Sequence, residues 1–351
     1  MRKPGRQEGE GTTMMKTRKA NYEETGNAGK PFSSSRFFSC HPGFLIILFL
    51  FLLFPRPASA AEPLAKRWAR WQAYAKTYKA SDLFPALKYP TGSDWLAAHF
   101  EPGQTFERYV KSKPTRLTKK RNRIVVQPIG TFTPKQQKML EALREHMAIY
   151  YQCKVDLFKT VPLPKKGFRK RSTGPQYLTK SITDGILIPK LPKDAAVYMG
   201  VTCADIYPGP GWNFVFGQAY LRLRVGVQSL ARYYPSFWGG ETPKDEYLIV
   251  LRRALKTMTH ETGHTFSMQH CTYFQCNING SNSLPESDRR DIHLCPVCLK
   301  KLQRNRKFDI AKRYRELGAF YKKHGLKAEA EWIAKRLKEI GGGGKAERQK
   351  K

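Results

Sequence analysis

The chain has 351 residues, of which 40% are hydrophobic and 12% aromatic, and this composition excludes an intrinsically disordered protein. The length is enough for one domain with a full hydrophobic core and an extension. The formal net charge is +35, and residues 1–60 carry nine Lys or Arg and four Asp or Glu, so about +30 remains in the rest of the chain.

The first 60 residues have the order of a secretory signal. Basic residues between positions 16 and 36 precede an apolar run at 44–54, and the small residues that follow offer a cleavage site after Ala60. An apolar run of 11 residues is too short for a membrane span, which needs about 20. We therefore predict a signal peptide or leader at 1–60 and export to the cell envelope or beyond. The alternative is a membrane anchor through residues 44–54 that is never removed.

Residues 61–122 are predicted to form a partly helical N-terminal extension. Apolar residues recur at helical spacing at its start, and Lys and Arg fill the opposite side, which indicates a helix with one packing face. The apolar positions are Leu64, Trp68, Trp71, Ala75 and Tyr78.

Strands and helices then alternate. The run at 123–130 predicts a buried strand, a helix follows from Pro134 to about Tyr150, and residues 154–158 predict a second strand. A basic loop is expected at 164–176. Further strands are predicted at 197–202 and within 214–230, where Gly217 marks a bulge or a close approach of another group. This order predicts an α/β fold.

A long helix is expected next, with Thr242 as its N-cap and Pro243 in its first turn. The side chains expected on its buried face are Leu248, Leu251, Leu255 and Met258.

The same helix leads into the motif HETGHTFSMQHC at 260–271. His260 and His264 are one turn apart on one face, so both can bind one metal ion, with Glu261 beside it. In a continuous helix His270 would lie roughly 15 Å further along the axis, so the chain must leave the helix near Ser267 for His270 to join them. Three histidines and an open fourth position predict a catalytic zinc.

Two close pairs of cysteines follow. Pairs with this spacing predict a structural zinc site with four sulfur ligands, and two disulfides or four free thiols are the alternatives. The four residues are Cys271, Cys276, Cys295 and Cys298. Apart from Cys40 in the leader, Cys153 and Cys203 remain, either as a disulfide or as free thiols. The other histidines past the leader, His99, His146, His293 and His324, lack ligand spacing.

The order and spacing of these residues resemble the archaemetzincins, whose pattern runs HExxHxxGxxHC, four residues, CxM, a spacer and CxxC. The resemblance covers roughly residues 90–320 and includes the segments 93–110, 123–130, 197–207 and 213–219. Two positions depart from the pattern. Ser267 stands where the family has a glycine with positive φ, a conformation that costs serine about 1 kcal/mol. Ile278 stands where the family has the methionine of a Met-turn.

The resemblance implies a zincin or metzincin-like α/β (α+β) fold. A mixed, twisted sheet would pack on the long zinc-binding helix, and a C-terminal helical subdomain would hold the four-cysteine zinc site. The catalytic domain would occupy residues 123–340, and a flexible basic tail would begin at the four glycines and occupy 341–351.

Together, the residues and the resemblance predict a zinc-dependent peptidase with two zinc ions per chain, one catalytic and one structural. Glu261 would act as the general base on a zinc-activated water, and peptides or proteins would be the substrates. The alternative is a non-catalytic, zinc-stabilised binding protein whose basic surface holds anionic polymers. No specific nucleic-acid-binding motif supports that alternative, and contact with a membrane is expected only if the leader is retained.

Overall fold

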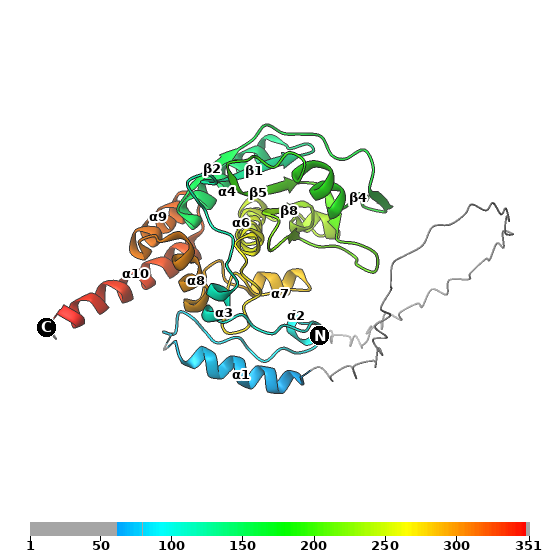
Figure 1. The fold of residues 1–351 in the computed structure, drawn as a ribbon. Helices are drawn as coiled ribbons and strands as arrows, with labels where there is room; N and C mark the ends of the chain where they lie inside the picture. The colour runs from blue at the N-terminus through cyan, green and yellow to red at the C-terminus, as the bar shows by residue number, and fades with distance from the viewer. Residues whose placement is uncertain (1–61, 79, 349–351) are drawn as a thin grey trace, which may run out of the picture. The chain divides into compact units, whose positions relative to one another are not determined.

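The structure is a computed structural model that describes residues 62–78 and 80–348 (Figure 1). The predicted signal peptide or leader at 1–60 lies outside these residues. Among the helices of the described part, none is long and apolar enough to cross a membrane.

A mixed five-stranded sheet forms the upper layer in Figure 1. Its strand order is β2-β1-β5-β8-β7, and the first four strands are parallel, while β7 at the edge is antiparallel to β8. The central strands are buried on both faces, which explains their nearly continuous apolar sequences. The strands are β1 (Arg123–Ile129), β2 (Lys154–Leu157), β5 (Ala195–Thr202), β7 (Gly217–Ala219) and β8 (Val225–Ser229). The predicted strands are therefore confirmed.

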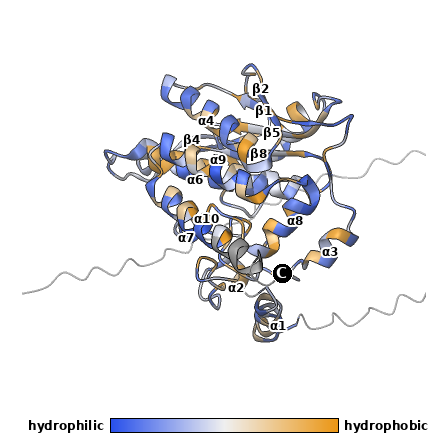
Figure 2. Ribbon diagram, turned by 90° about the vertical axis from the view of Figure 1, so that its left-hand side faces the viewer, coloured by the Kyte–Doolittle hydropathy of each residue, from blue (hydrophilic) through white to orange (hydrophobic). Residues whose placement is uncertain are grey.

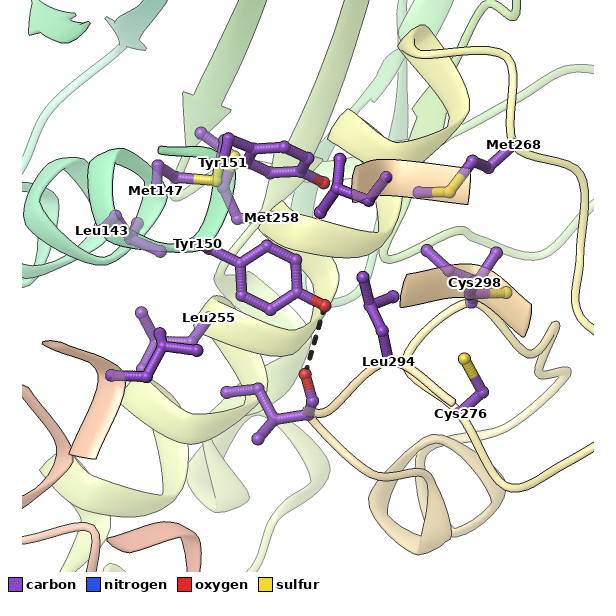
Figure 3. Close-up of a cluster of buried hydrophobic side chains, with 14 of the residues drawn as sticks. Leu143, Met147, Tyr150, Tyr151, Leu255, Met258, Met268, Cys276, Leu294 and Cys298 are labelled. Atoms are coloured by element: carbon purple, nitrogen blue, oxygen red, sulfur yellow. Dashed lines mark hydrogen bonds between the residues drawn. The ribbon is translucent and has the colours of Figure 1, made fainter. Parts of the chain in front are cut away.

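Helix α4 (Pro134–Tyr151) has the predicted bounds to within one residue. Thr133 caps it in a reciprocal pair of hydrogen bonds with Gln136, and Gln152 ends it in a left-handed conformation. Its buried face meets α6 (Glu246–Thr265), and the shared core continues toward the cysteines (Figure 3). There the Tyr150 hydroxyl donates to the Ile292 carbonyl oxygen at 3.4 Å.

Helix α6 begins three residues later than predicted. Pro243 and Glu246 form only a turn, in which the Glu246 amide donates to the Pro243 carbonyl at 3.0 Å. Asp245 is the N-cap residue, and Thr242 is exposed, so the predicted cap at Thr242 is wrong. Three of the four residues predicted for the buried stripe, Leu251, Leu255 and Met258, are fully buried, and Leu248 is only partly buried. Local capping signals cannot distinguish a turn from the first turn of a helix.

The predicted basic loop at 164–176 is largely a β-hairpin, so this prediction is wrong. Strand β3 (Phe168–Arg171) pairs with β4 (Gly174–Leu178), which also pairs with β6 (Asp205–Tyr207) in a second, three-stranded sheet. Side-chain hydrogen bonds between the two strands stabilise the hairpin. Arg169 and Arg171 both donate to the Gln176 side-chain oxygen, at 2.7 and 3.3 Å. A helical turn, α5 (Thr179–Ile182) and η1 (Thr183–Leu187), follows β4.

The N-terminal and C-terminal helices lie mostly on the side of α6 away from the large sheet (Figure 1). The N-terminal ones are α1 (Leu64–Lys76), α2 (Trp95–Ala98) and α3 (Phe106–Lys111). The chain between β8 and α6 forms the short helices η2 (Ala231–Tyr233) and η3 (Pro235–Trp238). The C-terminal helices are α7 (Leu284–Arg289), α8 (Pro296–Arg306), α9 (Ile310–Lys323) and α10 (Lys327–Arg348).

Residues of opposite hydropathy alternate along α3 and α8, as expected of helices with one buried face (Figure 2). Helix α9 packs against α4, and α10 packs against α9. Helix α10 continues through the four glycines, where the sequence predicted that a tail begins; the flexibility of that tail stays a prediction.

Candidate active site

The structure brings the three histidines of the motif together. His260 and His264 lie on the last two turns of α6, which ends at Thr265. Ser267 then has φ +66°, and the chain folds back. One ring nitrogen of His270 consequently lies within 4.8 Å of a ring nitrogen of each of the other two. The chain therefore leaves the helix near Ser267, as the sequence predicted.

Ser267 holds the turn with its own side chain. Its hydroxyl accepts a hydrogen bond from the Thr115 amide at 3.2 Å and donates to the Leu221 carbonyl at 3.0 Å, and its carbonyl accepts from Gln104 at 3.0 Å. Each hydrogen bond contributes about 0.5–1.5 kcal/mol, which is enough to offset the cost of a left-handed serine. A glycine could not make the two hydroxyl bonds.

The imidazoles of α6 are oriented by backbone oxygens. His260 Nδ1 lies 2.8 Å from the Asn277 carbonyl oxygen, and His264 Nδ1 lies 2.7 Å from the Met268 carbonyl oxygen. A carbonyl oxygen only accepts, so each Nδ1 carries the proton and each Nε2 presents a lone pair. For His260 the carbonyl oxygen lies closer to Nδ1 than the Arg290 nitrogen does, at 2.8 against 3.1 Å. Burial lowers the pKa of His264 to about 3 and the pKa of His260 well below its usual value, so both rings are neutral at neutral pH.

The two Nε2 atoms lie 3.0 Å apart. Two lone pairs at this distance repel each other unless a cation lies between them. Zinc bound by two imidazoles at tetrahedral angles separates their nitrogens by about 3.3 Å, since each Zn–N bond is about 2.0 Å. The donor set and its geometry therefore fit zinc.

His270 is oriented by a carboxylate from the N-terminal extension. His270 Nδ1 lies 2.6 Å from Glu101 Oε1, and the Trp95 indole donates to the same oxygen at 2.9 Å. Burial by itself would raise the pKa of Glu101, but the hydrogen bonds that its carboxylate accepts from His270 and Trp95 outweigh burial and lower the pKa. The Nε2 of His270 is thereby left free for the metal.

Glu261 lies beside the histidines and is only 6% exposed. Burial raises the pKa of Glu261 to about 8, against the opposing charge of Arg290. Its side chain lies directly on Gly217 of β7, where an added Cβ would come within 2.7 Å of Glu261 Cγ and Oε1. The close approach predicted at Gly217 is therefore confirmed, and Glu261 is the group that approaches.

A cleft of about 530 Å³ opens over these residues. The edge strand β7 and the preceding segment from Trp212 form one wall, and the end of α6 forms the floor. Trp95 of the extension and residues 281–282 complete the rim.

The four cysteines of the second predicted site form a separate buried cluster. Cys271 and Cys276 follow α6, and Cys295 and Cys298 lie at the start of α8. Their sulfur atoms all lie within 4.8 Å of one another and none of them forms a disulfide, so the alternative of two disulfides does not hold. The Cys271 and Cys295 sulfurs are 3.7 Å apart, and zinc with tetrahedral Zn–S bonds of about 2.3 Å requires about 3.8 Å.

The other cysteines and histidines of residues 62–78 and 80–348 do not join either cluster. Cys153 and Cys203 are free thiols, and burial raises their pKa to about 11 and about 12, so neither is reactive. His293, beside the cysteines in sequence, instead stacks on Trp332 at 3.8 Å. The His146 ring forms a hydrogen bond with the Tyr321 hydroxyl, His324 lies near Glu145, and the His99 ring stacks on Trp95.

Comparison with known proteins identifies the family. A family model described as Peptidase family M54 matches residues 194–304, which include the three histidines, Glu261 and the four cysteines. Archaemetzincin-2 of Homo sapiens is 36% identical over 269 residues, which cover 68% of this chain and 74% of the human protein. The chain belongs to the archaemetzincin family. It is a zinc metallopeptidase of that family, as the resemblance implied.

Archaeal archaemetzincins match a smaller part of the chain. The protein of Pyrococcus furiosus is 32% identical over 183 residues, which cover 52% of this chain and 93% of that protein. A crystal structure of the Methanopyrus kandleri archaemetzincin is 31% identical, with a TM-score of 0.44, and the match covers 54% of this chain and 98% of that one.

The second departure from the archaemetzincin pattern, Ile278, packs beneath the histidine helix. A Cβ on Gly263 would come within 2.7 Å of Ile278 Cδ1 and 3.0 Å of Met268 Cε. The Ile278 carbonyl also accepts from the Cys271 amide at 2.9 Å. Isoleucine thus supplies the bulk at this position, and the close contact explains a glycine inside a helix.

Glu101 and Arg290 are site residues that sequence analysis missed. The segment containing Glu101 resembles the family, but no spacing connects it with His270, 169 residues later. Arg290 follows α7 and lines the cleft, and basic residues are too common in this chain for one of them to stand out.

We expect that replacing Glu101 by alanine weakens zinc binding at the three-histidine site by about 10–100-fold, because His270 loses the group that orients its ring. The zinc affinity of Glu101→Gln should lie between that of Glu101→Ala and that of the wild type, since an amide oxygen still accepts from Nδ1. Competition with a chelator measures the affinity. Glu107→Gln, an exposed carboxylate of α3, is the control and should leave the affinity unchanged. An unchanged affinity in Glu101→Ala would show that the contact is not needed.

Gly217→Ala should lower peptidase activity by about 100-fold, because the new methyl group displaces Glu261 by a fraction of an ångström or more. Zinc content and thermal stability should change little. Gly209→Ala is the control, since a Cβ there meets nothing within 4 Å. Equal kcat/KM values for the two variants would contradict the positioning of Glu261 by this glycine.

Proposed function

We propose that the chain hydrolyses peptide bonds, with His260, His264 and His270 as ligands of the catalytic zinc and Glu261 as the general base. The observation that carries this proposal is the convergence of three imidazoles whose Nδ1 atoms all face oxygen acceptors. Zinc bound there would polarise the peptide carbonyl and lower the pKa of a water molecule toward about 7.

Glu261 has the environment of a proton carrier. Its carboxyl group is buried, forms no ion pair among the described residues, and has a pKa that burial raises to about 8. The charge of a bound zinc would lower that pKa and leave a carboxylate at neutral pH. This carboxylate takes a proton from the attacking water and then returns it to the leaving amine.

The edge of the large sheet supports the binding of an extended peptide. Strand β7 pairs with β8 on one side only, and its other side borders the cleft. A peptide that adds to this edge would gain main-chain hydrogen bonds along residues 213–219 and would pass over Glu261. Peptides or proteins in extended conformation are therefore the substrates that fit.

We further propose a second, structural zinc at the four cysteines, for a total of two per chain. Four buried thiols without disulfides form a closed site with no position for water or substrate. Cys271 directly follows His270, so a zinc at the cysteines would also anchor the third ligand of the catalytic site.

Metal analysis combined with cleavage profiling of a mixed peptide library tests the proposal. We expect two zincs per chain and hydrolysis that stops when a chelator is added and returns with zinc. One zinc, no cleavage and salt-sensitive binding of an anionic polymer would instead support a non-catalytic binding protein.

Export remains a proposal that rests on the sequence of residues 1–60. N-terminal sequencing of the native protein tests it, because a secreted form would begin at Ala61 and an anchored form would keep residues 44–54.

A further inference from the structure

Arg290 is a buried cation at the wall of the active-site cleft. It follows α7, is 7% exposed, and lines both this cleft and a neighbouring cavity of about 470 Å³. One terminal nitrogen donates to the Asn279 carbonyl at 2.5 Å, and the other donates to the Ser287 hydroxyl at 2.8 Å. Its Nε is buried and has no partner among the described residues.

No carboxylate forms an ion pair with Arg290 in the described part of the chain. The two residues before it on α7 do form ion pairs, Asp288 with Arg253 and Arg289 with Asp94. The two oxygens of Glu286 accept instead from the Trp95 amide at 2.8 Å and the Asn282 amide at 2.7 Å. Burial lowers the pKa of Arg290 and outweighs the charges of Glu261 and Glu286, neither of which forms an ion pair with it. A buried cation with no anion in contact is costly. Its retention at a cleft wall indicates that a ligand supplies the anion.

Two polar side chains of α6, Lys256 and Thr257, also lie near this part of the site. Lys256 is buried and donates to the Ser287 carbonyl at 2.6 Å, and burial together with the charge of Arg290 lowers its pKa to about 7. Thr257 lines the cleft one helical turn before Glu261, and its buried hydroxyl lies beside the Tyr233 hydroxyl. A carboxylate has the oxygens to accept from both Arg290 and Thr257.

We propose that Arg290 is a specificity-determining residue that binds a carboxylate of the peptide substrate. This inference rests on the proposed peptidase function. A terminal nitrogen of Arg290 lies 3.1 Å from His260 Nδ1, on the side of the ring away from Nε2. Because only one imidazole separates the guanidinium from the metal position, the carboxylate belongs to a residue next to the scissile bond. Its source is either an Asp or Glu side chain or the free C-terminus of a short substrate.

Paired peptides test the preference on the zinc-loaded protein. Each pair differs only by Glu or Gln at one position, scanned on both sides of the cleaved bond, and a second set has a free or an amidated C-terminus. A charge-assisted bond to a buried guanidinium predicts kcat/KM about tenfold or more higher for the carboxylate peptide. The Glu scan responds to a side-chain source, and the second set responds to a terminal source. A wild-type protein with no preference in either set overturns the proposal.

Variants assign the preference to this residue. Arg290→Gln should abolish it, and Arg290→Lys should keep part of it. Arg289→Gln is the matched control, because Arg289 is exposed and pairs with Asp94, and it should keep the full preference. If Arg290→Gln fails to fold, Thr257→Val is tested in its place. We expect it to lower the preference for the carboxylate peptide a few fold. An unchanged preference in Arg290→Gln, or in Thr257→Val and Arg290→Lys together, overturns the proposal.

A binding measurement separates this inference from the proposed catalysis. Trp95 and Trp212 both line the cleft, so their fluorescence reports peptide binding without turnover. The carboxylate member of the selected pair should bind about tenfold more tightly to the wild type and equally to Arg290→Gln. Selective binding without cleavage would contradict the peptidase proposal and leave the carboxylate site standing. Cleavage with unselective binding and unselective kcat/KM would contradict the carboxylate site and leave the peptidase proposal standing.

Discussion

Glu261→Gln is expected to lower kcat/KM for peptide cleavage by about 10²–10⁴-fold, the usual contribution of a general base. Glutamine has nearly the same shape, so the contact with Gly217 and the cleft should be preserved. The amide cannot take a proton from water. Since Glu261 does not belong to the cluster of three histidines, zinc content should stay at the wild-type value.

The control is Glu246→Gln, at the opposite end of the same helix, which should retain wild-type activity. Kinetics on a single peptide and metal analysis of the same preparations provide the measurement. Undiminished turnover in Glu261→Gln would remove the general-base assignment. Loss of zinc in this variant would show instead that Glu261 acts through the metal site.

Cys298→Ser is expected to lower the free energy of unfolding by about 4 kcal/mol or more, the size typical of a lost metal site. The cysteine cluster joins the loop after α6 to α8, and the core around Tyr150 extends to it (Figure 3). Cys271 adjoins His270, so the variant should also lose affinity for the catalytic zinc. Thermal unfolding and zinc content per chain measure these effects.

Cys153→Ser is the matched control, because Cys153 is a free thiol outside the cluster. It should keep both zincs and unfold at nearly the wild-type temperature. A Cys298→Ser protein that also keeps both zincs and its unfolding temperature would contradict a structural metal at the cysteines.

Periodicity predicted most of the elements that position the site. The apolar runs of β1 and β5 are visible in sequence because parallel strands buried on both faces are almost wholly apolar. The hairpin of β3 and β4 was missed, since Arg169 and Arg171 pair with Gln176 and no apolar run marks the strands. The start of α6 was placed too early because Thr242 and Pro243 also suit a turn.

Sequence alone determined which side chains could bind metal. The spacing of His260 and His264 is that of one helical turn, and Ser267 occupies the position where a turn is required, so these relations are local. The tertiary structure alone decided what orients and surrounds them. Glu101, Gly217 and Arg290 come from the extension, the sheet edge and the end of α7, and their contacts with the histidines and Glu261 depend on how distant segments pack. Packing between distant segments has no periodic signature in sequence, because any chain separation can be closed at a modest cost in entropy.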